Sequence, residues 1–456
     1  MLKKTQTIHI NFTGGIISPG YLLSILEIAE TAKISEVRFG QRQQLIIEVS
    51  AQTALLFADH VSTTPNIISA YPATGIFISN TWLSEGIYKD VFEMLNWESK
   101  LKINVCDSRN TFTPFFTGHL NWIAGTQPNY WHLVFRYPKS NQLFAWPEQL
   151  YTNHIGELSR QLETQLLNHE PIQGVPVEKD LQLPDFHLPY YEGFNKYDQY
   201  YWLGIYRRNE YFPVSFLKGL CHICLETKTG QLYATPWKSL IIRNIEQEHR
   251  PLWDYLLGKY GINVRHAANE LNWQIPDNNE DALVLKRHII RHFDSADVRT
   301  YGLCFSVGHH CFGSIVITQQ EAKYKTVLKG QLRYDISYTP DFNPNSGILI
   351  NYRSGVAKEH LGPYITALCK YFYERHNTND PLPGYVAAHT VAIPPVEKYV
   401  HQCPACLSIY DEQMGDPDQS IVPNTPFEQL PDQYQCALCE GPKADFKQVS
   451  YATLTA

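Results

Sequence analysis

The 456-residue sequence has no apolar run long enough to cross a membrane and no basic cluster interleaved with aromatic residues. A membrane-spanning helix needs about 20 mostly apolar residues, and nucleic-acid binding leaves a basic patch or stripe. The positive charge at Lys3 and Lys4 is not followed by the uninterrupted apolar segment of a secretion signal. We therefore expect a cytoplasmic protein that binds neither membranes nor nucleic acid.

Cysteine is scarce in the first 376 residues, which contain six. They are Cys106, Cys221, Cys224, Cys304, Cys311 and Cys369. No four of them have the spacing of an iron–sulfur cluster. Cys221 and Cys224 form a C-x2-C pair inside an apolar helical pattern, so we expect buried, structural thiols. A redox-active or metal-binding pair is the alternative.

The C-terminal region, in contrast, holds four cysteines in two C-x2-C pairs. Cys403 and Cys406 form the first pair, Cys436 and Cys439 form the second, and 29 residues separate the pairs. Four thiolates can enclose one tetrahedral ion, and such a cage suits zinc or iron. Zinc would make this a structural knuckle, whereas iron would make it a one-electron carrier.

The residues around these pairs indicate a small, stiff domain. Prolines that restrict the backbone stand at positions 404, 417, 423, 426 and 431. Tyr410, Phe427, Tyr434 and Phe446 are the candidate aromatic core. So short a segment needs the metal as a staple in order to fold.

In order and spacing, residues 397–449 resemble rubredoxin. Besides the cysteines, the resemblance rests on Tyr410-Asp411, Gly415-Asp416-Pro417, Ile421-Val422-Pro423, Thr425-Pro426-Phe427, Leu430-Pro431, Lys443 and Phe446. It implies a mononuclear Fe(Cys)4 centre, held by Cys403, Cys406, Cys436 and Cys439, that cycles between ferric and ferrous. Zinc is the alternative metal.

Four residues depart from the rubredoxin pattern. Ala437 stands where that family usually has proline, and Leu407, Asn424 and Glu440 stand where it usually has glycine. Glycine there permits a positive φ and lets backbone N–H groups approach the sulfurs, whereas a bulky residue is strained in that conformation. Asparagine tolerates the left-handed region better. We expect these departures to affect the reduction potential more than the choice of metal.

Negative charge is concentrated in the same region. Residues 397–456 contain nine acidic residues and three lysines, a net charge of −6 out of −7 for the whole chain. An acidic carrier can be steered to the basic face of a redox partner. Solubility alone is the alternative explanation.

The rest of the chain contains an internal repeat. With an offset of 195 residues, Leu45-Ile46-Ile47 aligns with Leu240-Ile241-Ile242. In each copy, a helical apolar pattern of about a dozen residues precedes two short strand-like runs. The first copy also has a candidate strand before its helix. A helix followed by a hairpin, present twice, predicts two α+β modules.

Both copies resemble the ferredoxin-like half-domains of nitrite and sulfite reductases. The resembling residues are Gly14-Gly15-Ile16-Ile17-Ser18-Pro19 and Glu36-Val37-Arg38-Phe39-Gly40-Gln41-Arg42-Gln43 in the first copy, and Ala234-Thr235-Pro236-Trp237-Lys238-Ser239-Leu240 in the second. In that family the two half-domains pair, and each is followed by a larger α/β domain. The resemblance implies an α+β fold with two ferredoxin-like half-domains and two nitrite/sulfite reductase-like α/β domains, followed by a small rubredoxin-like metal domain.

The predicted boundaries follow this order. Residues 1–60 and 181–280 are the half-domains, 61–180 and 281–376 the sirohaem-domain-like regions, 377–396 a linker and 397–456 the rubredoxin-like domain. The linker is rich in Asn, Pro, Gly and Ala, which is typical of a tether.

Nitrite and sulfite reductases bind sirohaem bridged to a [4Fe–4S] cluster, and the cluster needs a C-x5-C and a C-x3-C pair. Here Cys304 and Cys311 are spaced C-x6-C, and the second pair is missing. We therefore expect neither sirohaem nor the cluster. By resemblance Arg38, Arg42 and Lys238 would face the carboxylates of the macrocycle. Solvent-exposed strand side chains in a degenerate scaffold are the alternative, which we favour.

These observations lead to three hypotheses about function. The first is an electron-transfer protein with a mononuclear Fe(Cys)4 site, whose body docks a redox partner, with nitrite or nitrate reductase as the candidate in nitrate and nitrite assimilation. The second is a sirohaem-containing nitrite/sulfite reductase-type oxidoreductase with a fused rubredoxin donor. The third is a zinc-stabilised interaction protein. Because we expect a carrier rather than a catalyst, no catalytic residue is assigned.

Overall fold

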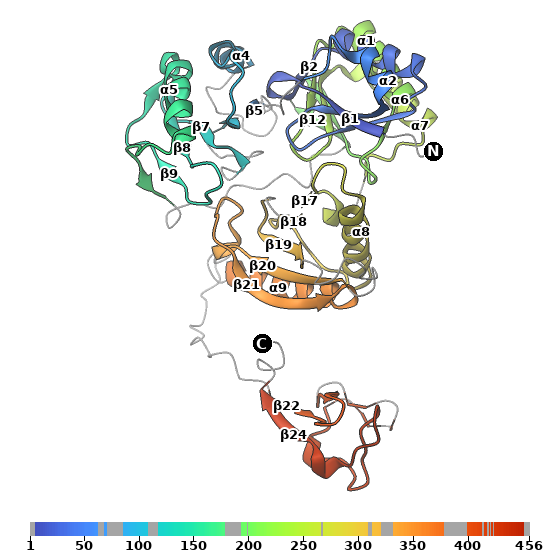
Figure 1. The fold of residues 1–456 in the computed structure, drawn as a ribbon. Helices are drawn as coiled ribbons and strands as arrows, with labels where there is room; N and C mark the ends of the chain where they lie inside the picture. Colours follow the sequence, from blue (N-terminus) through green and yellow to red (C-terminus); the bar gives the residue numbers. More distant parts are fainter. Residues whose placement is uncertain are drawn as a thin grey trace. The chain divides into compact units, whose positions relative to one another are not determined.

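The computed structural model of the chain divides into two compact units, Met1–Tyr373 and Glu374–Ala456 (Figure 1). It describes residues 5–62, 68–70, 85–107, 117–177, 193–197, 199–265, 268–308, 312–320, 332–377, 399–412, 415–416, 419, 421–422 and 424–450. Within these described residues, the first unit contains four sheets and the second contains one. The finer boundaries expected within the first unit stay predictions.

The first unit begins with the repeated module. The first copy comprises β1 (Thr5–Ile10), α1 (Pro19–Thr31), β3 (Glu36–Phe39) and β4 (Leu45–Ser50). The second comprises β13 (Tyr200–Ile205), α6 (Val214–Glu226), β15 (Leu232–Ala234) and β16 (Leu240–Ile245). Both ends of β1 and β13, of α1 and α6, and of β4 and β16 differ by 195 residues. The predicted repeat and its helix-then-hairpin order are therefore confirmed.

The two copies exchange edge strands and share one core. The first sheet has the order β1-β4-β3-β14, and β14 (Phe212–Pro213) comes from the second copy. The other sheet has the order β12-β13-β16-β15-β2, with β12 at Gly193–Tyr197, and its β2 (Ile16–Ile17) comes from the first copy. A single apolar cluster contains Leu22 and Ile25 of α1 together with Phe216 and Leu220 of α6. Neither copy buries its apolar face alone, so the pair forms one body.

Two further sheets complete the first unit, and each begins with three parallel strands. One has the order β11-β9-β8-β7-β6-β5, with β10 beside β8. Its strands are β5 (Ile68–Ala70), β6 (Ile103–Cys106), β7 (Leu120–Ala124), β8 (Tyr130–Phe135), β9 (Phe144–Ala145), β10 (Leu150–Tyr151) and β11 (Val175–Pro176). The other sheet has β17 (Trp273–Gln274), β18 (Phe305–Val307), β19 (Ile315–Gln319), β20 (Arg333–Tyr338) and β21 (Ile350–Ala357) in sequence order. Helices α4 (Glu85–Met94) and α5 (Ile155–Leu167) lie beside the first of these sheets. Helices α8 (Glu280–Ser295) and α9 (Leu361–Asn377) lie beside the second.

Local rules set where several helices begin. The side chain of Ser18 accepts a hydrogen bond from the backbone N–H of Tyr21, and Pro19 occupies the first turn of α1. Asn279 caps α8 by accepting from the N–H of Ala282 at 2.9 Å. Within the described ranges, no helix combines the length and the apolar character needed to cross a bilayer.

The second unit is a three-stranded sheet with two long loops. Strand β22 (Tyr399–Gln402) lies between β23 (Ile409–Tyr410) and β24 (Lys447–Ser450). The predicted aromatic core is confirmed, because Tyr410, Phe427 and Tyr434 are buried together with Leu430 and Phe446 packs against them. The Tyr434 hydroxyl donates to Asp416 at 2.9 Å, which anchors the loop between the cysteine pairs.

Candidate metal centre

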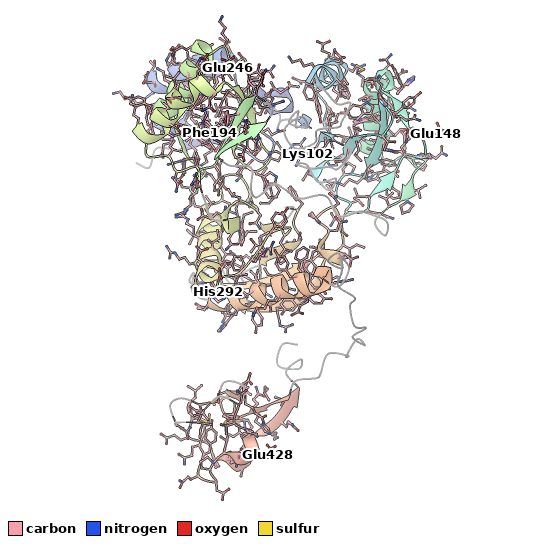
Figure 2. All side chains as sticks on the ribbon, turned by 180° about the vertical axis from the view of Figure 1, so that it is seen from behind. Lys102, Glu148, Phe194, Glu246, His292 and Glu428 are labelled. Atoms are coloured by element: carbon pink, nitrogen blue, oxygen red, sulfur yellow. The ribbon has the colours of Figure 1, made fainter. Side chains whose placement is uncertain are left out.

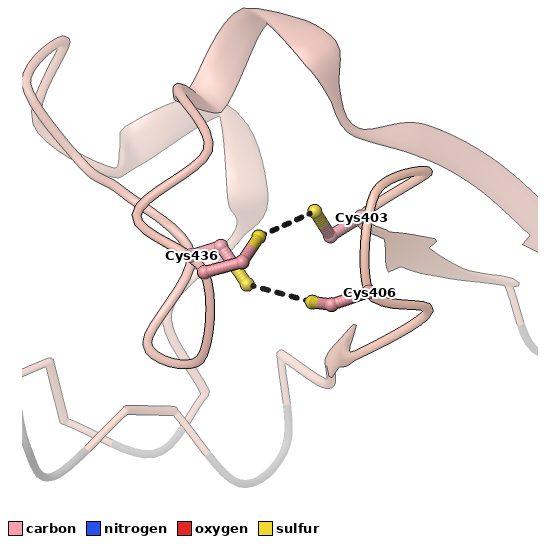
Figure 3. A group of neighbouring side chains, drawn as sticks. Cys403, Cys406 and Cys436 are labelled. Carbon is pink, nitrogen blue, oxygen red and sulfur yellow. Dashed lines mark hydrogen bonds between the residues drawn. The ribbon is translucent and has the colours of Figure 1, made fainter.

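The four C-terminal cysteines meet at one point of the second unit (Figure 3). Their sulfurs all lie within 4.8 Å of one another. The Sγ atoms of Cys403 and Cys439 are 3.5 Å apart, and those of Cys406 and Cys436 are 3.4 Å apart. A tetrahedral cage with metal–sulfur bonds of about 2.3 Å has edges of roughly 3.8 Å. The four residues therefore fit one metal ion with little movement.

Two loops with the same backbone hydrogen bonds present these sulfurs. In the first loop Cys403 N donates to Ser408 O (2.9 Å) and Leu407 N donates to Cys403 O (2.8 Å). In the second loop the matching bonds run from Cys436 N to Gly441 O (2.8 Å) and from Glu440 N to Cys436 O (2.9 Å). Because each loop closes on itself in this way, each pair of thiols is oriented before a metal binds. A Cβ at Gly441 would lie 3.5 Å from the sulfurs of Cys403 and Cys439, which is an ordinary van der Waals distance, so a side chain there would border the cage.

The three departures from the glycine pattern do adopt the left-handed conformation. Leu407 has φ 63°, Asn424 has φ 66° and Glu440 has φ 57°. The backbone thus adopts the left-handed conformation at all three positions although none of them is glycine. For a leucine, this conformation costs about 1–2 kcal/mol relative to the right-handed region.

We expect Leu407→Gly to stabilise the second unit by about 0.5–1 kcal/mol, because relief of strain exceeds the greater freedom of glycine in the unfolded chain. Little burial is lost, since Leu407 is 64% exposed. The measurement is denaturant unfolding of the metal-loaded chain, followed through the visible thiolate absorption. Leu438→Gly is the matched control, because Leu438 is 77% exposed and is not among the positive-φ residues. Equal destabilisation by both changes would contradict the prediction.

Hydrogen bonds favour the thiolate form of two ligands, Cys436 and Cys406. At Cys439 the N–H of Gly441 lowers the pKa, but hydrogen bonds with the other three thiols raise it overall to about 12. Burial raises the pKa of Cys436, but hydrogen bonds from the Ser408 hydroxyl and from the N–H groups of Leu438 and Cys439 lower that pKa overall to about 6. The Ser408 hydroxyl and N–H also lower the pKa of Cys406. Metal ligands of this kind must be deprotonated, so these donors prepare the site.

Exposure differs among the four ligands. Cys403 and Cys436 are buried, Cys406 is partly covered and Cys439 is exposed. The cage therefore has a closed side against the protein and an open side at Cys439. Ser408, which bridges two of the ligands, was not among the predicted residues, and its only sequence signal is a hydroxyl two positions after a C-x2-C pair.

The three cations predicted to face a macrocycle are all buried in the first unit. Arg38, Arg42 and Lys238 are 4%, 8% and 4% exposed. The interpretation of these residues as solvent-exposed strand side chains is therefore wrong. Because side chains alternate along a strand, Arg38 lies on the opposite face of the sheet from the core residues Val37 and Phe39. That face is covered by protein as well, so Arg38 is buried.

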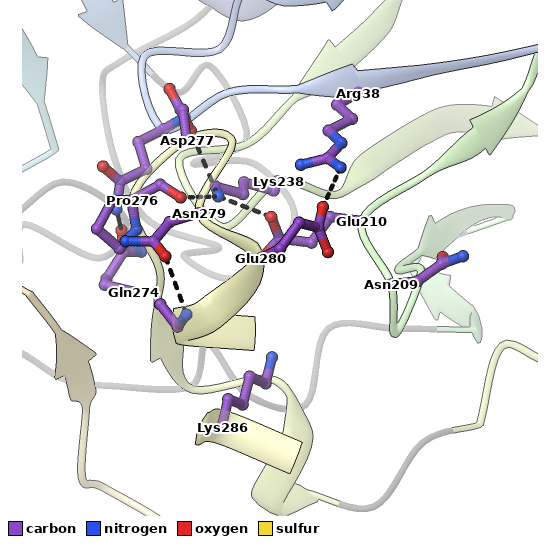
Figure 4. A network of polar contacts seen from close by, with 12 residues as sticks. Arg38, Asn209, Glu210, Lys238, Gln274, Pro276, Asp277, Asn279, Glu280 and Lys286 are labelled. Carbon is purple, nitrogen blue, oxygen red and sulfur yellow. Dashed lines mark hydrogen bonds and ion pairs between the residues drawn. The ribbon is translucent and has the colours of Figure 1, made fainter. Parts of the chain in front are cut away.

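The protein itself engages each of these cations, and Figure 4 shows the contacts of Arg38 and Lys238. Lys238 Nζ lies 2.7 Å from Glu210 Oε2 and 3.3 Å from Asp277 Oδ1. Arg38 pairs with Glu280, and its guanidinium carbon lies 3.6 Å from the centre of the Tyr211 ring. Arg42 contacts β6 instead, where it donates to Asn104 Oδ1 at 2.8 Å and to the carbonyl of Ile103 at 3.2 Å.

One short segment supplies two of these partners, Asp277 and Glu280. Residues 274–280, between β17 and the first turn of α8, contact the hairpins of both copies. Gln41 Nε2 donates to Gln274 at 2.8 Å, and the backbone N–H of Gln41 donates to Asp277 at 3.1 Å. Gln274 Nε2 donates in turn to the carbonyl of Pro236 at 3.3 Å. The sequence carried no local signal for this arrangement, because the partners lie far apart along the chain.

Lys286 of α8 is buried beside this network, and its amine donates to the Tyr206 hydroxyl at 2.6 Å. Burial lowers its pKa to about 8, although Glu210 and Glu270 raise it. In the unfolded chain the pKa is about 10.4. Between these two values the unfolded chain binds a proton that the folded chain has released, so this group makes stability rise with pH.

We expect Lys286→Met to be more stable than the parent chain at pH 7 by about 1–2 kcal/mol, because the cost of burying a charge disappears. The difference should shrink as the pH approaches 10, where the parent amine is neutral in both states. Urea unfolding of both chains at pH 7 and pH 9.5 gives the measurement. A difference that does not change with pH would show that burial of the charge is not its cause.

Among the residues that the structure describes, the remaining cysteines and histidines of the body form no comparable cage. Cys221 and Cys224 are fully buried in α6, as predicted, and burial raises the pKa of Cys221 to about 12. Cys106, Cys304 and Cys369 are buried singly, and Cys311 lies outside the described residues. Among the described residues, one other group could hold a metal, the surface set Glu246, Glu248 and His249, of which Figure 2 labels Glu246.

Comparison with known proteins agrees with the cysteine cage. Residues 400–446 match the Rubredoxin family. The Probable Rubredoxin-2 of Methanocaldococcus jannaschii is 41% identical over 54 residues, which is 12% of this chain and 96% of that protein. The High molecular weight rubredoxin of Moorella thermoacetica is 41% identical over 49 residues, 11% of this chain and 21% of that protein. The chain thus spans about a fifth of the length of the Moorella relative.

The body is similar in fold to a solved structure. The Mycobacterium tuberculosis NirA protein matches with a TM-score of 0.57 and 13% identity, covering 81% of each chain. This match agrees with the expected α+β fold of the body ahead of the small metal domain. At this identity the likeness concerns the fold alone.

Proposed function

Because the chain belongs to the rubredoxin family through its C-terminal unit, we propose that it is an electron carrier with one iron ion at Cys403, Cys406, Cys436 and Cys439. The meeting of the four sulfurs within 4.8 Å carries the proposal. When bound, the iron would supply one-electron transfer between ferric and ferrous states. Zinc would fit the same thiolates, but a purely structural zinc knuckle has no need of the rubredoxin-like residues between the pairs.

The residues of the cage have separable tasks in this proposal. The paired loops hold the thiols in place, so that little rearrangement accompanies a change of charge. Donors from the backbone and from Ser408 stabilise the thiolates. Cys439, the exposed ligand, gives a partner the closest approach to the centre.

In the same proposal the body is a docking module for a redox partner, with a nitrite or nitrate reductase as the candidate in a cytoplasmic setting. The likeness of the body to the NirA fold supports this setting. The net charge of −6 on residues 397–456 would favour a partner with a basic face around its electron entry site. We propose no part for nucleic acid or membranes.

We further propose that the body binds neither sirohaem nor a [4Fe–4S] cluster. Two of its three candidate cations are already paired with carboxylates, Lys238 with Glu210 and Asp277, and Arg38 with Glu280, while Arg42 donates to Asn104 and Ile103. A sirohaem carboxylate would have to displace these internal carboxylates. The fold likeness is the observation that favours the second candidate, a sirohaem oxidoreductase with the rubredoxin as its donor.

Metal analysis and a visible spectrum of the full chain, purified after expression with ample iron, test the proposal. We expect one iron per chain, a ferric–thiolate spectrum that bleaches on reduction and no tetrapyrrole after acid extraction. A stoichiometric sirohaem would move the assignment to the reductase. A colourless protein with one zinc would leave the interaction protein and remove the case for electron transfer.

A further inference from the structure

The hydroxyl of Ser408 reaches across the cage from one cysteine loop to the other. Its Oγ lies 2.8 Å from the sulfur of Cys436 and 3.3 Å from the sulfur of Cys406. Ser408 itself is partly buried and belongs to the first loop, whereas Cys436 belongs to the second. One side chain thus touches a ligand from each pair.

The backbone of the first loop puts the hydroxyl there. Leu407 turns the chain through the left-handed region, and the carbonyl of Ser408 accepts from Cys403 N at 2.9 Å before β23 begins. The equivalent position in the second loop is Gly441, whose carbonyl accepts from Cys436 N. Because glycine has no side chain, the two loops match in their backbone but differ in this one donor.

We propose that Ser408 sets the reduction potential of the centre by donating a hydrogen bond to the Cys436 thiolate. This inference rests on the proposed function, since it concerns the same four thiolates. One electron from the partner protein adds one negative charge to the metal and its ligands, and no proton is gained or lost. A donor aimed at a ligand sulfur stabilises the more negative, reduced state more than the oxidised state. The hydroxyl therefore raises the potential.

The test compares Ser408→Thr with Ser408→Val in the iron-loaded full chain. These two side chains have nearly the same shape and differ in the hydroxyl. In the valine variant we expect a lower midpoint potential, so that the ferrous-to-ferric ratio at a fixed ambient potential falls by about three- to tenfold. The thiolate-to-iron absorption should also move to longer wavelength, because the sulfur is less stabilised. The threonine variant should stay close to the parent chain.

A control shows whether any lost hydroxyl has this effect. Thr425→Val removes a hydroxyl of the same unit that donates to the carbonyl of Val422 at 2.7 Å, and it should leave potential and spectrum unchanged. Equal potentials for the threonine and valine variants at Ser408, both with full iron content, would overturn the role of this hydroxyl. A parent chain without iron would instead overturn the proposed function.

Discussion

Replacement of Cys436 by serine should remove the visible chromophore completely and lower the iron content of the full chain to below about one tenth of the parent value. Cys436 is 2% exposed and its sulfur receives hydrogen bonds from Ser408, Leu438 and Cys439, so serine replaces a stabilised thiolate by a shorter hydroxyl that stays protonated near neutral pH. We expect the second unit to depend on the metal for its fold, because its core comprises few side chains, so loss of the metal should unfold it. Iron analysis, the visible spectrum and limited proteolysis measure these effects.

The other C-x2-C pair of the chain provides the matched control. Cys221→Ala removes a buried thiol from α6 of the first unit, where the side chain packs in the apolar core. Iron content and spectrum should stay at the parent level, while the body loses some stability through the small cavity. If Cys221→Ala removed iron and Cys436→Ser did not, the assignment of the centre would fall.

Breaking the buried ion pair of the body should have the second large effect. Lys238→Met is expected to destabilise the first unit by about 3–5 kcal/mol, because it leaves Glu210 buried without its cation. Both side chains are 5% exposed and their charged atoms are 2.7 Å apart. Urea unfolding, followed by tryptophan fluorescence of the body, gives the free energy. The double change Lys238→Met with Glu210→Gln should recover most of the loss.

An exposed ion pair with a similar N···O distance serves as the control, because it shows whether burial of the pair, rather than the contact itself, causes the loss of stability. Lys218 Nζ lies 2.6 Å from Glu30 Oε2, where the glutamate side chain is 60% exposed. Lys218→Met should change the unfolding free energy little, because water replaces the lost partner. Equal effects of Lys218→Met and Lys238→Met would falsify the view that Lys238 is held in a dry network. If the Lys238 and Glu210 double variant bound sirohaem and the parent chain did not, the buried ion-pair network would be what excludes the cofactor.

Much of the fold could be predicted from the sequence, because the signals were local or periodic. The apolar pattern of α1 recurs in α6 at the 195-residue offset, and the strand-like runs at β4 and β16 follow at the same distance. The exchange of β2 and β14 between the two copies could not be predicted, since strands of two residues have no periodic signal. Edge pairing of such short strands depends on the finished shape of both sheets.

The metal site was determined almost wholly by the sequence. Cysteine spacing fixes two short loops, and the left-handed conformations at Leu407 and Glu440 follow from the backbone hydrogen bonds of those loops. These constraints act over a few residues, so the pattern carries them. Only the tertiary structure decided that the Ser408 hydroxyl reaches the sulfur of Cys436, 28 residues away. It also decided that Arg38 meets Glu280, 242 residues away. Burial and pairing across such distances depend on which surfaces the packing brings together, and no local preference of the chain encodes that.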